Sequence, residues 1–160
     1  MRRDPVLLGF ALVLTLLAGR AGAGVLDAPL PTFSDAQPAQ RVAVLSTAVK
    51  SNALDIDVVC TNLGTGAVDI GLEVFDHDGV RGNTIGLGNG AILAVGAGAT
   101  VTIGTTNTAA LHEDVVIALE APVVNLANGS ARVVATSAAL GCTAFAVDKF
   151  HSVVDQRGSE

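Results

Sequence analysis

Two short clusters of acids and histidine are the groups in this chain best suited to bind a metal ion. The first is Asp-His-Asp-Gly at 76–79 and the second is His112-Glu113-Asp114. Carboxylate oxygens and imidazole nitrogens are common ligands of divalent cations. A calcium loop of the EF-hand type also needs oxygen ligands at its fifth and twelfth positions, where this chain has Val80 and Leu87. The EF-hand pattern therefore fails.

Both clusters also have a simple structural interpretation. Asp76 and Asp78 stay as candidate metal ligands, but Asp and Gly are the residues that a turn between two strands needs. Metal sites on helices space their ligands three or four residues apart, and no helical period surrounds 112–114. We expect a turn at 76–79, a solvated loop at 112–114, and no cofactor.

No pattern of a catalytic site is present in the sequence. The serines lack the context of a nucleophile elbow. The glycine-rich run at 86–90 lacks the preceding strand and following helix that a phosphate-binding loop requires. The chain has five Phe and no Trp or Tyr, so it has few rings on which a sugar could stack. These features predict a non-enzymatic protein.

The N-terminus has the three parts of a secretory signal peptide. Arg2 and Arg3 supply the positive charge, an apolar run follows from 6 to 18, and Ala21-Gly22-Ala23 is a small-x-small cleavage site. The apolar run is shorter than the roughly 20 residues of a transmembrane helix. We expect residues 1–23 to be removed by cleavage between Ala23 and Gly24. The mature chain is then secreted or periplasmic and has no membrane anchor.

Cysteine usage fits an oxidising compartment. The chain has two cysteines, Cys60 and Cys142, which allow one intramolecular pairing. Disulfides persist outside the cytoplasm. We predict a Cys60–Cys142 disulfide that ties an early strand to a late one, although Cys142 is out of phase with the apolar residues that follow it.

The charge of the chain excludes some partners. Its formal net charge is −6, and removal of residues 1–23 makes it −8. Binding to phosphate backbones or anionic lipid surfaces needs clustered Lys and Arg. We expect no nucleic-acid partner, and the partner to be a protein or cell-surface component.

Alternation of apolar and polar residues predicts short strands throughout the mature chain. An irregular leader at 24–40 contains three prolines. The domain then spans 41–150, with strands expected near 42–47, 54–60, 68–74, 91–95, 100–104, 115–119, 131–137 and 142–148, and a polar tail at 151–160. The last two strands are expected to form a hairpin. Seven or eight strands without helical periods predict an all-β fold, an antiparallel sandwich, with a small barrel as the alternative.

The alternation also assigns faces to the strands. Ile70 and its apolar neighbours two residues apart are expected to face the core, and the acids between them to face water. This assigns Asp55, Asp57, Asp69 and Glu73 to the solvent face. Phe75 follows on that face and is expected to be exposed.

Three stretches resemble exported bacterial immunoglobulin-like or fibronectin-III-like domains, of the cell-adhesion-related bacterial type. They are Val59-Cys60-Thr61-Asn62-Leu63-Gly64, the strand and turn at 68–79, and the Leu93-to-Ile103 stretch. The resemblance covers about 42–103 and implies an Ig-like sandwich in an extracytoplasmic setting. The sequence departs from the pattern at Val95, where proline is usual, and it lacks the Trp and Tyr of antibody domains.

Together these observations favour a secreted or periplasmic structural or interaction module. Such a module would act through its loops and edge strands. The alternative is a sandwich that binds a small ligand, ion or glycan through the loops at 76–79 or 112–114.

Overall fold

The computed structural model describes residues 24–108, 111–148 and 154–157. The expected signal peptide at 1–23, including Ala23, lies outside these residues. The strands are β1 Gln40–Lys50, β2 Leu54–Asn62, β3 Val68–Phe75, β4 Ala91–Val95, β5 Thr100–Gly104, β6 Val115–Val116, β7 Leu126–Ala135, β8 Leu140–Asp148 and β9 Val154–Arg157; one 3-10 turn, η1, spans Ile85–Leu87. The fold is therefore all-β, as predicted.

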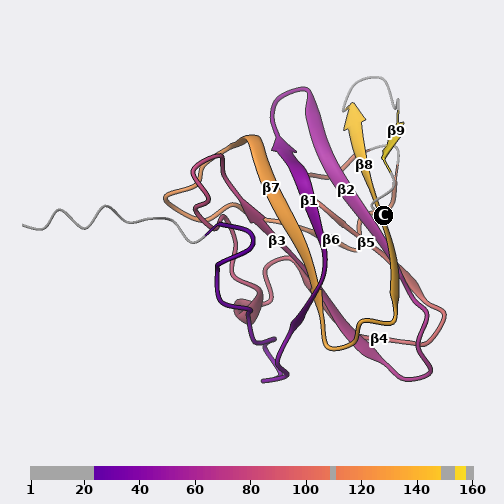
Figure 1. Cartoon of the computed structure of the whole chain (residues 1–160). Coiled ribbons are helices and arrows are strands. Elements are labelled where there is room, and N and C mark those ends of the chain that lie inside the picture. Colours follow the sequence, from indigo (N-terminus) through magenta and orange to yellow (C-terminus); the bar gives the residue numbers. More distant parts are fainter. Residues whose placement is uncertain (1–23, 109–110, 149–153, 158–160) are drawn as a thin grey trace, which may run out of the picture.

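The strands form one mixed sheet that is nearly closed into a barrel. Its order is β4-β3-β7-β1-β2-β5-β6, and β8 pairs with β2 and β9. Neighbours are antiparallel except β5 and β6, which run parallel, so the expectation of a purely antiparallel sheet is wrong. Figure 1 shows β7 and β1 side by side, with β8 beyond β2.

The inward faces follow the predicted phase. Ile56, Val58 and Cys60 of β2 lie in the core with Ile70 and Leu72 of β3. Ile70 and Leu72 have no exposed surface. Alternation along a strand therefore identified the apolar face correctly.

The expected hairpin between the last two long strands does not form. β7 pairs with β1 and β3, whereas β8 pairs with β2. The connection between β7 and β8 thus crosses from one part of the sheet to another. Short connections often join paired strands, but this one joins two strands that pair with different neighbours.

Other boundaries also differ from the expectations. The strand expected at 115–119 is reduced to β6, although Ile117 is buried. β9 extends the sheet into the segment expected as a polar tail, because it pairs with β8.

The leader at 24–39 is packed onto the outer face of the sheet. Phe33 forms a small second core with Ile85 of η1 and Val134 of β7. A Cβ on Gly71 would lie 2.5 Å from the Ile85 side chain, so glycine at this position lets η1 approach β3. Figure 1 shows this indigo segment beside β3 and β7.

Candidate functional site

The acids expected to face water are buried. Asp55, Asp57 and Glu73 have no exposed surface, and Asp69 is 7 % exposed. The alternation is correct, since these side chains lie on the outer face of the sheet. The prediction of solvent exposure is wrong because irregular segments cover that face.

Glu73 forms a buried ion pair with Arg132 of β7. The Nε of Arg132 donates to Oε2 of Glu73 at 2.6 Å, and both side chains are fully buried. Burial raises the pKa of Glu73, while Arg132 opposes that shift. On its other side, Glu73 Oε1 lies 3.7 Å from Arg81 Nη1.

Arg132 also holds the leader against the sheet. Its guanidinium donates to the carbonyl oxygens of Val25, Ala28 and Pro29, at 3.2, 2.8 and 2.7 Å. It lies 5.3 Å from the ring centroid of Phe75, which is fully buried rather than exposed as expected. Arg132 thus anchors residues 25–29 to the sheet.

A second acidic site lies where the chain after β5 folds back over β2. Gly104 pairs with Asp57, and an ideal Cβ at Gly104 would lie 2.5 Å from Asp57 Oδ1 and 2.8 Å from Glu113 Cγ. The missing side chain leaves room for both acids. The Thr108 hydroxyl lies 2.6 Å from Glu113 Oε1 and 3.3 Å from Asp57 Oδ2, so it bridges the two groups.

This environment changes the acidity of Asp57. Burial, and then the negative charge of Glu113, raise its pKa from 3.8 to about 7, while the hydrogen bond from Thr108 acts in the opposite direction. Near neutral pH Asp57 is therefore protonated for part of the time.

The Asp57→Asn variant is expected to remove a pH dependence of stability. The pKa of Asp57 is higher in the folded state, so the folded protein binds more protons, and the free energy of unfolding falls as the pH rises from about 4 to 7. The loss amounts to roughly 2–4 kcal/mol. Urea unfolding at pH 5 and pH 8 measures it.

Asparagine resembles the protonated acid, so the variant should match the wild type at pH 5 and exceed its stability at pH 8. An equal decline in both proteins over this range would contradict the assignment to Asp57.

The side chains of the two clusters noted in the sequence have different environments in the structure. In 76–79, Asp76 Oδ1 accepts hydrogen bonds from the backbone N–H groups of Asp78 and Val80, which makes the predicted turn. The ligand atoms of Asp76, His77 and Asp78 lie within 4.8 Å of one another, but His77 and Asp78 are largely exposed. This geometry is that of an Asx turn on the surface.

In 112–114 the His112 Nε2 lies 3.8 Å from Asp114 Oδ1, and Glu113 has separate partners. Glu113 joins Asp57 and Thr108, whereas Asp114 Oδ2 accepts from the Thr102 backbone N–H at 2.7 Å. The His112 side chain is 91 % exposed. The expectation of a wholly solvated loop is thus wrong for Glu113, and no sequence signal linked Glu113 to Asp57, which lies far away in the chain.

The predicted disulfide is present. Cys60 and Cys142 are directly opposite in the β2–β8 ladder, with Cα atoms 4.1 Å apart. The bridge therefore joins adjacent strands of one part of the sheet, rather than tying β2 to a hairpin.

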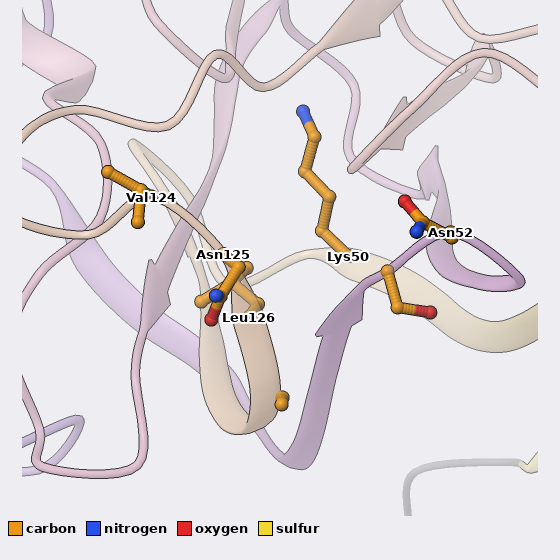
Figure 2. Close-up of a pocket in the computed structure, with 7 residues that line it drawn as sticks. Lys50, Asn52, Val124, Asn125 and Leu126 are labelled. Atoms are coloured by element: carbon orange, nitrogen blue, oxygen red, sulfur yellow. The ribbon is translucent and has the colours of Figure 1, made fainter.

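A pocket of about 470 Å³ lies at the β1–β2 turn and the start of β7. Figure 2 shows Lys50 and Asn52 on one side and Val124, Asn125 and Leu126 on the other. Lys50 Nζ donates to the carbonyl of Ile117 at 2.9 Å. The lining has no aromatic ring and no carboxylate, so its chemistry is that of a surface hollow with amide and ammonium donors.

Comparison with known proteins gives no relative. No family model, curated protein or solved structure matches this chain. Among residues 24–108, 111–148 and 154–157, no helix has the length and apolar character to cross a membrane.

Proposed function

We propose that this chain is an exported, non-enzymatic module that binds another protein or cell-surface component through the edge of its sheet. In this proposal residues 1–23 are a signal peptide and the mature protein begins at Gly24 in the periplasm or outside the cell. The sequence resemblance to Ig-like and fibronectin-III-like exported domains supports the proposal, as does the disulfide. Nucleic acid and membrane lipid are not expected as partners.

The observation that carries the proposal is the uncharged edge strand β4. Among the described strands it pairs with β3 alone. Its sequence, Ala-Ile-Leu-Ala-Val, has no charge and no proline, and Leu93 is 41 % exposed. Exposed edges normally carry Lys, Pro or other features that prevent pairing, and their absence favours strand addition by a partner.

The backbone of β4 is oriented for such pairing. The N–H of Leu72 donates to the carbonyl of Gly90 at 2.9 Å, so Gly90 and Ile92 face β3. Alternate residues of an antiparallel strand face opposite neighbours, hence the backbone of Ala91 and Leu93 faces away. The bulge at Ala94, with φ of 54°, limits the accessible edge to these residues.

Site-specific crosslinking in the producing cells tests the proposal. A photoreactive residue in place of Leu93 should give adducts with another polypeptide, several-fold more than the same residue in place of Leu87, which is 82 % exposed. The intact mass of the released protein should correspond to a chain that starts at Gly24.

Equal adduct yields at both positions would contradict edge binding. They would favour the alternative, a module for a small ligand, ion or glycan, for which the pocket lined by Lys50 and Asn52 is the supporting feature. A released chain that retains Met1 would contradict cleavage.

A further inference from the structure

We propose that Asp57, Thr108 and Glu113 form a proton-dependent latch, which fastens the residues after β5 to β2 below neutral pH and releases them above it. Asp57 has no exposed surface, and no amide, ammonium or alcohol group of the described residues donates to its Oδ1. Its carboxyl group is instead in hydrogen-bonding contact with that of Glu113. Two carboxyl groups can hydrogen-bond to each other only while one of them carries a proton.

The packing at Gly104 holds the two acids together. Gly104 is opposite Asp57 in the β2–β5 ladder, and an ideal Cβ on it would lie 2.5 Å from Asp57 Oδ1 and 2.8 Å from Glu113 Cγ. Because glycine has no side chain, the stem of Glu113 lies directly against the Gly104 backbone, beside the Asp57 carboxyl. Two carboxylates this close repel each other when both are ionised.

Glu113 is the member of the latch that can leave. Asp57 belongs to β2, which pairs with both β5 and β8, whereas Glu113 lies in the connection before β6 and is only partly buried. Oε1 of Glu113 accepts hydrogen bonds from the Thr108 backbone N–H at 2.9 Å and from the Thr108 hydroxyl at 2.6 Å. Departure of Glu113 would therefore leave the Thr108 N–H without its acceptor.

The connection is fixed independently on both sides of the latch. Before it, the N–H of Thr105 donates to the Ile56 carbonyl at 2.9 Å. After it, the N–H of Asp114 donates to the Thr102 carbonyl at 2.9 Å. We therefore expect release to be local, with both of these backbone hydrogen bonds kept.

The latch is closed while the proton is present. Burial, and then the negative charge of Glu113, raise the pKa of Asp57 to about 7. The closed form thus binds the proton more tightly than an open form in which Glu113 has moved into solvent. The equilibrium shifts toward the open form as the pH rises from about 4 to 7. This goes beyond the proposed edge binding, since the latch and β4 are different parts of the sheet.

The neighbouring strands contribute few other charges. Asp55 lies two residues before Asp57 on the same face of β2, and Lys50 is opposite Asp55 in the β1–β2 ladder. β5 has no charged residue. The charged residue of β8, Asp148, is at the far end of the β2–β8 ladder. The strands therefore place no second ionisable group between the two carboxyls of the latch.

The connection itself contains one group that needs a control. His112 and Asp114 flank Glu113, and His112 Nε2 lies 3.8 Å from Asp114 Oδ1. Imidazole groups change charge in the same range of pH. A variant at His112 therefore separates its effect from that of the latch.

Amide hydrogen exchange, measured by NMR, tests the proposal. The protection factor of the Thr108 amide should fall roughly tenfold to a hundredfold between pH 5 and pH 8, because the closed form binds the proton. At pH 8 this amide should be about tenfold less protected than those of Thr105 and Asp114. In Asp57→Asn the fall should disappear, since the asparagine side chain does not titrate, whereas His112→Gln should retain it.

A titration of the wild type keeps the test valid if Asp57→Asn folds poorly. The carboxyl carbon of Asp57 and the amide nitrogen of Thr108 should titrate with one shared midpoint near pH 7. Different midpoints, or a Thr108 protection factor that is the same at pH 5 and pH 8, would overturn the proposal.

Two further outcomes would also overturn it. Equal protection of the Thr108, Thr105 and Asp114 amides at pH 8 would mean that the connection opens as a whole. A fall that persists in Asp57→Asn and disappears in His112→Gln would assign the pH dependence to the imidazole.

Discussion

Replacement of Arg132 by methionine is expected to lower the free energy of unfolding by about 3–5 kcal/mol. The substitution leaves the Glu73 carboxylate buried without its strongest partner, and the carbonyls of Ala28 and Pro29 lose their donors. Loss of one member of a buried pair costs more than the pair contributes, because the other charge is left desolvated.

Urea denaturation measures this loss, and limited proteolysis locates it. The leader should be cleaved near Leu26 and Leu30 much faster in Arg132→Met, since the guanidinium holds residues 25–29. Arg81→Met is the matched control. Arg81 lies 3.7 Å from the same carboxylate, but its side chain is 45 % exposed, so its loss should cost less than about 1 kcal/mol.

The double variant Arg132→Met/Glu73→Leu separates charge from packing. If the buried charge causes most of the loss, removal of both charges should recover at least half of it. Equal losses in Arg132→Met and Arg81→Met would contradict a buried pair at the centre of this contact.

Removal of the disulfide is expected to have an effect of similar size. Cys60 and Cys142 are separated by 82 positions, so the bridge restricts a long loop of the unfolded chain. The chain-entropy model assigns such a bridge about 4–5 kcal/mol. The Cys60→Ala/Cys142→Ala variant should therefore unfold at a much lower urea concentration than the oxidised wild type.

The reduced wild-type protein is the control for this variant. It retains both sulfur atoms and so isolates the cross-link from the small cavity that alanine would leave at buried Cys60. Coincident urea midpoints for oxidised and reduced protein would show that the bridge adds nothing to stability.

Both buried acidic sites arise because irregular segments cover the outer face of the sheet. The leader covers the outer face of β3 and β7, and the segment after β5 covers that of β2 and β5. Under the leader, Glu73 is matched by Arg132. Under the second segment, Asp57 meets another acid, Glu113, and its pKa rises to about 7. The first site is therefore an anchor, whereas the second responds to protons.

Local sequence was sufficient for the features that depend on near neighbours. Alternation placed Ile70 and Leu72 in the core, since a strand directs successive side chains to opposite faces whatever its partners are. The turn at 76–79 follows from the capacity of Asp76 to accept its own backbone N–H groups. Because the chain has two cysteines, the pairing of Cys60 with Cys142 could be predicted without the structure.

Only the tertiary structure decided which strands pair and what covers them. β7 and β8 are adjacent in sequence but belong to different parts of the sheet, because each buries its apolar face against distant strands. In the sequence, Asp57 and Glu73 alternate with apolar residues in the same way as acids that face water. Their burial depends on segments more than 40 residues away, which carry Glu113 and the leader carbonyls, and no local pattern in a strand reports such a contact.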